Sequence, residues 1–231
     1  MVLGAGLYPD MTIILVVPMV ELQYFGNSLF KIKNKKESIL IDPVSIGKVK
    51  KSDVEDASLI LLTNETEDHF DKNLIEKVVS KGKVKVVAHD SILKQLNLPR
   101  SQKVSIGIDS EVFLNNFKIK TTTAHYPQSF YPMGFLIDCG GKRIYHAGIT
   151  ALLDTFSKID ADVALLPMNS KSMDVVDVVR AAKMMKPKKL IPMHCDVGDA
   201  RNSAIDLKKR IGESVLNTET ILLAPGKKMK V

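Results

Sequence analysis

Two side chains that can bind a metal ion stand next to each other in the polar segment 63–70. They are Asp68 and His69, and the segment follows the apolar run 58–62. A carboxylate oxygen beside an imidazole nitrogen is a ligand pair that suits zinc. The run predicts a buried strand, so the pair lies in a turn at a strand end, where a rigid base often carries chemistry. Segment 63–70 is therefore a candidate metal-binding loop that needs partners from elsewhere in the chain.

Further ligand candidates are the histidines of the chain. Five occur, namely His69, His89, His125, His146 and His194, and four of them lie at or beside the ends of predicted strands. A single histidine at such a place is more often a hydrogen-bonded structural residue than a ligand. Several of them together with an Asp-His pair favour a shared site. His89, at the border between a strand and a helix cap, is interpreted as structural.

The elements that must position these residues are mostly strands at first, followed by alternating strands and helices. Strands are predicted at residues 20–25, 28–33, 38–41, 84–88, 117–123, 133–138, 143–146, 163–166, 190–193 and 220–223. Helices are predicted at 71–82 and 90–96, capped by Asp71 and Asp90, and at 174–185 and 200–211. No linker interrupts this order, so residues 1–231 are predicted to form a single α/β domain, with 1–18 as an N-terminal extension.

Five short motifs follow one another along these elements. They are the strand and turn 22–28, the strand 39–43 with its Asp-Pro end, the loop 63–69, the segment 145–150 and the strand end 191–194. In this order they resemble the metallo-β-lactamase superfamily, most of all its branch of metal-dependent hydrolases that includes ascorbate-6-phosphate lactonase. The resemblance runs from Glu21 to the C-terminus. It implies a four-layer α-β-β-α sandwich with an active site at one edge, where the two sheets meet.

Members of this superfamily generally bind two metal ions, and the chain departs from that pattern at the first. The resemblance places Asn64, Thr66 and His125 at the first metal position. An amide and a hydroxyl replace imidazole poorly at zinc, so this position is predicted to be empty. Ile149 stands in place of the bridging aspartate, and Asn27 in place of a turn histidine. Losing a bridging carboxylate together with one cation is electrostatically consistent.

The second metal position keeps its terminal ligands, which the resemblance identifies as Asp68, His69 and His194. Three protein ligands with one position open to water are typical of catalytic zinc. Asp68 and His125 are then the predicted catalytic residues, with His125 as a general base or a substrate-orienting group. The structural alternative is that His125 ends a strand and bonds a backbone carbonyl. The sequence predicts one zinc ion at this position, or none.

Composition excludes several classes of protein. The net charge is +7, but few aromatic residues accompany the lysine clusters, so no stacking platform for nucleic acid is visible. Two cysteines predict no disulfide framework, which favours a cytoplasmic location. The apolar run 11–17 ends at Pro18 and is too short to span a bilayer. We therefore expect no membrane or nucleic-acid partner, and the apolar content of 1–18 suggests an extra edge strand or a homo-oligomer contact.

Two functions compete on these observations. The first is a hydrolase with one zinc ion and a small-molecule substrate, an ester, a lactone or a phosphate-bearing metabolite. The second is a catalytically inactive family member that serves as a binding or scaffolding module. A nucleic-acid-processing function has only the basic charge in its support. Stoichiometric zinc that is lost on Asp68→Ala or His194→Ala favours the first function, and a metal-free protein indifferent to chelator favours the second.

Overall fold

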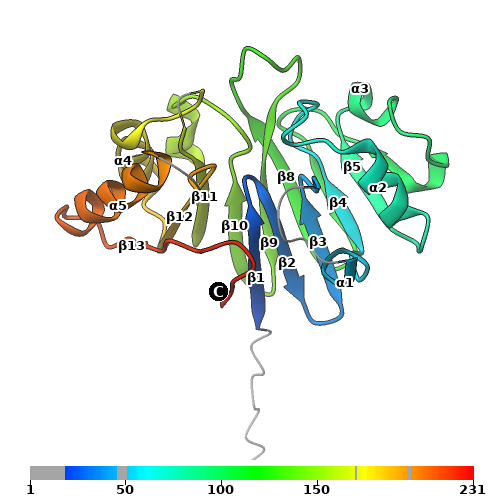
Figure 1. Cartoon of the computed structure of the whole chain (residues 1–231), viewed down its shortest axis with the longest axis horizontal. Coiled ribbons are helices and arrows are strands. Elements are labelled where there is room, and N and C mark those ends of the chain that lie inside the picture. Colours follow the sequence, from blue (N-terminus) through cyan, green and yellow to red (C-terminus); the bar gives the residue numbers. More distant parts are fainter. Residues whose placement is uncertain (1–18, 46–50, 170, 197–198) are drawn as a thin grey trace, which may run out of the picture.

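A computed structural model describes residues 19–45, 51–169, 171–196 and 199–231. Within these residues, two seven-stranded mixed sheets pack face to face (Figure 1). Sheet A contains, in spatial order, β14 (Lys228–Lys230), β1 (Val20–Gly26), β2 (Leu29–Asn34), β3 (Glu37–Ile41), β4 (Leu59–Leu61), β5 (Lys85–Ala88) and β6 (Lys103–Ser105). Sheet B contains β13 (Glu219–Thr220), β12 (Lys189–Met193), β11 (Val163–Pro167), β10 (Lys142–His146), β9 (Met133–Cys139), β8 (Phe117–Thr123) and β7 (Glu111–Leu114).

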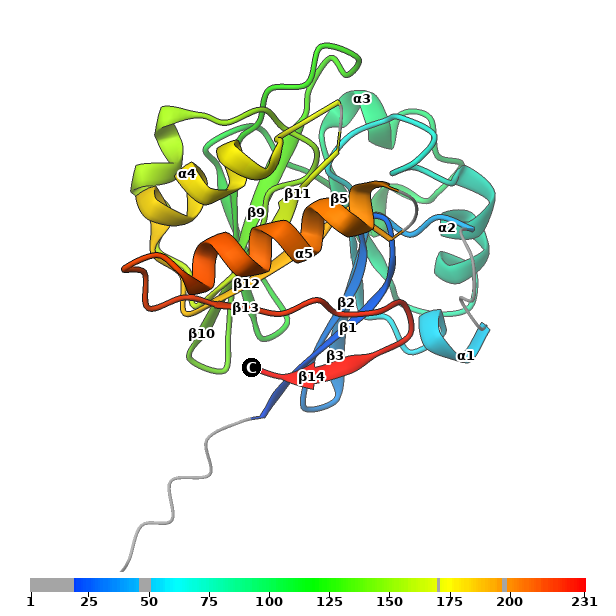
Figure 2. The same cartoon turned by 60° about the vertical axis from the view of Figure 1, so that its left-hand side comes forward.

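Helices cover the outer face of each sheet. Those on sheet A are α1 (Lys51–Val54), α2 (Lys72–Val79) and α3 (Asp90–Leu93), with the 3₁₀ turn η1 (Arg100–Gln102) nearby. Those on sheet B are the 3₁₀ turn η2 (Asp154–Lys158), α4 (Val175–Met185) and α5 (Asp199–Gly212). Figure 2 shows α4 and α5 lying across sheet B. In the described parts of the chain, every helix is too short or too polar to traverse a bilayer.

Three hydrophobic cores separate the four layers. In β3, Ile39 and Ile41 pack between the sheets, whereas Leu40 packs against the helices on sheet A. The same alternation occurs in β11, because successive side chains of a strand point to opposite faces. Strands buried on both faces read as continuous apolar runs, which is why these strands are visible in the sequence. The predicted four-layer α-β-β-α sandwich is confirmed.

The parallel strands bring chemically active loops to one edge. β3 and β4 are parallel neighbours in sheet A, and β11 and β12 are parallel neighbours in sheet B. Asp42 follows β3, the segment 63–70 follows β4, and His194 follows β12. The ends of these strands meet where the two sheets come together, as the resemblance implies for an active site.

Several predicted elements differ from the structure in their details. Asp71 caps α2 as predicted, because its carboxylate accepts from the Leu74 amide at 2.9 Å, but the helix ends at Val79. The predicted cap Asp90 is wrong: the Nδ1 atom of His89 lies 3.3 Å from the Ser91 amide and accepts from it. An unprotonated imidazole nitrogen can accept a hydrogen bond from a backbone amide, as a carboxylate oxygen can. The predicted strand 220–223 is shorter, and the extension 1–18 lies outside the described residues.

One prediction concerns Gly148, which lies two residues after the end of β10 and has little room for a side chain. Gly148 has φ +66°, and an added Cβ would lie 2.8 Å from the Met133 carbonyl oxygen. Gly141 has φ +75° with nothing within 4 Å of such a Cβ. We expect Gly141→Ala to cost about 1 kcal/mol from the positive φ alone. Gly148→Ala is expected to cost about 1–3 kcal/mol more from overpacking. Urea unfolding measures the free energy of unfolding of both variants. Equal decreases in the two variants would contradict the steric argument.

Candidate metal centre

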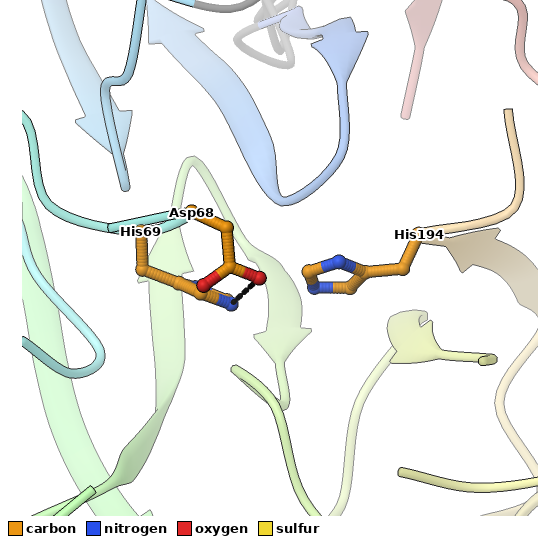
Figure 3. Close-up of side chains that lie close together, drawn as sticks. All are labelled: Asp68, His69 and His194. Carbon is orange, nitrogen blue, oxygen red and sulfur yellow. Dashed lines mark ion pairs between the residues drawn. The ribbon is translucent and has the colours of Figure 1, made fainter. Parts of the chain in front are cut away.

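Three side chains with metal-ligating atoms come together at the edge where the sheets meet. Asp68 and His69 come from the loop after β4, and His194 comes from the end of β12. One ligand atom from each residue lies within 4.8 Å of the others (Figure 3). These are the three residues that the resemblance places at the second metal position. The structure thus brings together residues that are far apart in the chain.

A buried carboxylate orients His69. Asp42 is fully buried, and its Oδ2 lies 2.7 Å from Nδ1 of His69. Asp42 also accepts from the Thr63 amide at 2.8 Å and from the Thr63 hydroxyl at 2.7 Å. An ionised carboxylate only accepts, so Nδ1 of His69 carries a hydrogen and Nε2 is left with the lone pair in the neutral ring. Carboxylate–histidine pairs of this kind fix the tautomer and orientation of metal ligands.

The Nε2 atoms of His69 and His194 are buried without a hydrogen-bond partner among the described residues. The two rings lie with centroids 5.0 Å apart. Buried polar atoms normally have a partner, because leaving one unpaired costs about 1–3 kcal/mol. Burial holds the pKa of His194 well below its usual value, and the neighbouring His69 lowers it further. His194 is therefore neutral and offers a lone pair, so the two rings suit a bound cation.

The carboxylate of Asp68 completes the group from the solvent side. Its side chain is 45% exposed, and Oδ2 lies 3.7 Å from Nε2 of His69. Oδ1 accepts from the Thr66 hydroxyl at 2.7 Å, which fixes the plane of the carboxylate. Two imidazoles and one carboxylate form a donor set that zinc or iron(II) accepts in open, catalytic sites. The residues present therefore fit a divalent transition metal.

Two of the residues at the first metal position, Asn64 and Thr66, form hydrogen bonds with each other. The carbonyl oxygen of the Asn64 side chain accepts from the Thr66 amide at 2.9 Å and lies 2.5 Å from the Thr66 hydroxyl. The Asn64 amide group donates to the Thr63 hydroxyl at 3.1 Å. Ile149 is buried beside Thr150. A hydrogen-bond network thus occupies two positions where the resemblance places histidines, and an apolar side chain occupies the position of the bridging aspartate.

His125 and His146 lie outside the group of three ligand atoms. His125 is exposed, and its backbone amide donates to the Thr150 hydroxyl at 2.8 Å. Its predicted role as a general base stays a prediction. His146 is buried; its Nε2 donates to the Ser28 carbonyl at 2.9 Å and its Nδ1 accepts from the Gly148 amide at 3.1 Å. Both ring nitrogens of His146 form hydrogen bonds, so His146 is structural.

Sequence reasoning missed the role of Asp42 and of its neighbours. The Asp-Pro strand end was read only as part of a motif, although an acidic residue directly after a buried strand is a usable signal. The Asp42 amide donates to the Leu61 carbonyl at 2.9 Å, which places Asp42 beside the loop after the parallel strand β4. Ser28 and Thr63 also place hydroxyl oxygens 3.1 and 3.2 Å from Nδ1 of His69. No pattern in the sequence indicates these two hydroxyls.

Comparison with known proteins shows which protein family has this arrangement. Residues 21–194 match the family described as Beta-lactamase superfamily domain. A UPF0173 metal-dependent hydrolase of Thermus thermophilus is 31% identical over 196 residues, which cover 76% of this chain and 84% of the relative. A second UPF0173 metal-dependent hydrolase, from Methanosphaera stadtmanae, is 29% identical over 230 residues, which cover 90% of this chain and 97% of the relative.

Solved structures share the fold over nearly their whole length. Igni18, a metallo hydrolase from the archaeon Ignicoccus hospitalis, superposes with a TM-score of 0.80 at 24% identity, covering 92% of this chain and 98% of that one. The metallo-beta-lactamase fold protein YhfI from Bacillus subtilis superposes with a TM-score of 0.76 at 16% identity, covering 93% and 100%. The sandwich, the family match and the curated relatives agree with the resemblance seen in the motifs. The chain therefore belongs to the beta-lactamase superfamily, and its fold is the metallo-β-lactamase fold.

Proposed function

We propose that this protein is a hydrolase whose centre uses a single zinc ion held by Asp68, His69 and His194. The observation that carries the proposal is the pair of buried Nε2 atoms, on His69 and His194, without partners in the described residues and close to the Asp68 carboxylate. The relatives in Thermus thermophilus and Methanosphaera stadtmanae are called metal-dependent hydrolases, which supports this class of activity. Two nitrogen ligands and one oxygen ligand support zinc.

Each residue of the centre has a separate task in this proposal. When bound by Asp68, His69 and His194, zinc would supply Lewis acidity toward a carbonyl or phosphoryl oxygen and would lower the pKa of a bound water molecule to about 7. Asp42 holds His69 in the tautomer that presents Nε2 to the centre. Asp68, whose side chain is 45% exposed, is placed to accept a hydrogen bond from an attacking water. His125, which is exposed, is the proposed proton acceptor.

The loop 124–132 between β8 and β9 supports a small substrate. Glu65, in the metal-binding loop, accepts from the Ser129 hydroxyl and from the Phe130 amide, both at 2.8 Å. Burial and the charge of Asp68 raise the pKa of Tyr126, so the phenol of Tyr126 lies within the electrostatic reach of that carboxylate. Loop 124–132 is thus fastened to the metal-binding loop. We infer a small ester, lactone or phosphate-bearing metabolite as the substrate.

Metal content and stability test the proposal together. Protein purified without added metal is analysed by mass spectrometry for zinc and iron, and its melting temperature is measured with chelator and with excess zinc. Zinc at about 100 times its Kd stabilises the folded state by about 2.7 kcal/mol, which corresponds to a rise of several degrees. A melting temperature indifferent to both additions, with no bound metal, would overturn the proposal. Bound zinc without turnover of ester, lactone and phosphodiester substrates would favour the binding-module alternative.

A second prediction concerns His125. If His125 accepts a proton, His125→Ala is expected to lower kcat by about 100-fold or more, while zinc affinity and melting temperature stay unchanged. The limb of the pH–rate profile that reports the base is expected to vanish with it. Steady-state kinetics across pH on the zinc-loaded protein measure both effects. An unchanged kcat would assign His125 to its structural alternative, as a residue in the loop that follows strand β8.

A further inference from the structure

One turn in sheet A touches both of the loops that carry the candidate ligands. Asn27 lies between β1 and β2, and its side-chain amide donates to the Asp68 carbonyl at 2.6 Å. Its own backbone carbonyl accepts from the His194 amide at 3.0 Å. Figure 3 shows His194 entering from the side opposite to Asp68 and His69. Asn27 therefore bridges the ligands that come from sheet A and the ligand that comes from sheet B.

Two further side chains hold this bridge in place. The carboxylate of Asp196, two residues beyond His194, accepts from the backbone amide of Asn27 at 2.7 Å. It also accepts from the Tyr24 hydroxyl, which lies 2.8 and 2.7 Å from its two oxygens. Tyr24 is fully buried and stacks on Phe30 with centroids 4.6 Å apart. We call Tyr24, Asn27 and Asp196 the inter-sheet clamp.

The backbone at both ends of the bridge is in the left-handed region. Asn27 has φ 56° and His194 has φ 62°, and neither residue is glycine. Such conformations cost about 1–3 kcal/mol each and persist only where the surroundings hold them. The hydrogen bond between the His194 amide and the Asn27 carbonyl joins these two residues directly. Asp196 and Tyr24 fix the Asn27 end of that bond, so the direction of the His194 side chain depends on the clamp.

We propose that the inter-sheet clamp positions His194 relative to Asp68 and His69, and thereby sets the geometry of the candidate metal centre. The proposal rests on the proposed function for its role, but the clamp side chains supply no ligand atom themselves. Metal ligands must sit close to their ideal distances, so a looser His194 lowers affinity even when all three ligands are present. A change in metal affinity while all three ligands remain present distinguishes the clamp from hydrogen bonds that only stabilise the fold.

Two variants test the clamp with little disturbance elsewhere. Tyr24→Phe removes one hydroxyl and keeps the ring that stacks on Phe30. Asn27→Gly keeps the left-handed backbone accessible and removes the amide that bonds the Asp68 carbonyl. The matched control is Tyr145→Phe, which removes another buried hydroxyl, 3.3 Å from the Thr122 hydroxyl, in the core between sheet B and its helices.

The first readout is metal binding. Competition with a chromophoric chelator is expected to show zinc affinity about tenfold or more weaker in Tyr24→Phe and in Asn27→Gly. The visible spectrum of the cobalt(II)-substituted protein is expected to shift in both, because the ligand geometry changes. Tyr145→Phe is expected to lower stability while affinity and spectrum stay as in the wild type. Wild-type affinity and spectrum in both clamp variants would overturn the positioning role.

The second readout needs no metal. In the metal-free protein, amide hydrogen exchange at His194 is expected to be about tenfold faster in Tyr24→Phe, with Ile191 in β12 unchanged. An unchanged rate at His194 would overturn the clamp whether or not the wild type binds zinc. Faster exchange in a protein that binds no zinc would instead overturn the proposed function and leave the clamp as the device that fixes His194.

Discussion

Substituting His194 by alanine is expected to abolish zinc binding and with it all metal-dependent hydrolysis. The variant retains only Asp68 and His69 from the three ligands that meet within 4.8 Å. Loss of residues that merely support a ligand weakens metal affinity by about 10–100-fold, so loss of a ligand itself is expected to exceed about 100-fold. Competition with a chromophoric chelator measures the affinity, and hydrolysis of ester and lactone substrates measures the activity.

The metal-free form of the same variant is expected to behave differently. Nε2 of His194 is buried without a partner among the described residues, and such an atom costs about 1–3 kcal/mol. Removing the ring eliminates that cost while some packing is lost, so the free energy of unfolding in chelator is expected to change by less than about 1 kcal/mol. The zinc-dependent increase in stability is expected to disappear.

The matched control for His194→Ala is His89→Ala. His89 caps α3 away from the ligand group, so this control is expected to lower stability by about 1 kcal/mol and leave zinc affinity unchanged. A His194→Ala variant that binds zinc as the wild type does would remove His194 from the centre. A His89→Ala variant that loses zinc would show that the assay reports folding rather than ligation.

Substituting Asp42 by asparagine is expected to weaken zinc affinity by about 10–100-fold. The change keeps the shape of the side chain but replaces one accepting oxygen by a donating amide. Asp42 accepts from the Thr63 amide on Oδ1, and from the Thr63 hydroxyl and His69 on Oδ2. An asparagine NH₂ on the Oδ1 side would face the Thr63 amide, which is itself a donor. The arrangement that avoids this clash places the NH₂ toward His69.

That arrangement disturbs the tautomer of His69. Nδ1 must then accept, so the hydrogen of the neutral ring moves to Nε2, the nitrogen that faces the candidate centre. Metal binding requires the opposite tautomer, and the free energy of restoring it is lost from the affinity. Isothermal titration with zinc at constant pH measures the loss, and urea unfolding in chelator measures any accompanying change in the metal-free protein.

Asp71→Asn serves as the matched control for Asp42→Asn. Asp71 is likewise a carboxylate that accepts from a backbone amide, at the N-terminus of α2, but its partners are Leu74 and Ser45. This control is expected to leave zinc affinity unchanged and to change stability little, because asparagine caps a helix about as well as aspartate does. If Asp42→Asn binds zinc as tightly as the wild type, the carboxylate does not support the metal through His69.

Much of the fold was predictable because its signals are local. The strands β3, β4 and β11 are nearly continuous apolar runs because both of their faces are buried, whereas β1, β2 and β8 alternate apolar with polar residues between turns. The short edge strands β6, β7 and β14 were not predicted. They carry little periodicity, and pairing with a neighbouring strand is what makes them strands. The cap of α3 was misassigned because an aspartate is the commoner cap, while His89 had the better position.

In the candidate site, as in the fold, some features follow from the sequence and others appear only in the structure. The sequence by itself determined that Asp68 and His69 are adjacent in a loop after a buried strand, and that a histidine ends a later strand. The resemblance implies that His194 joins them, and the tertiary structure supplies the physical reason, because the packing of the two sheets brings the ends of β4 and β12 together. The structure also gives the physical reason why His146 is not a ligand, since both of its ring nitrogens are already hydrogen-bonded. Hydrogen-bond partners depend on neighbours in space, and residue type and spacing do not encode them.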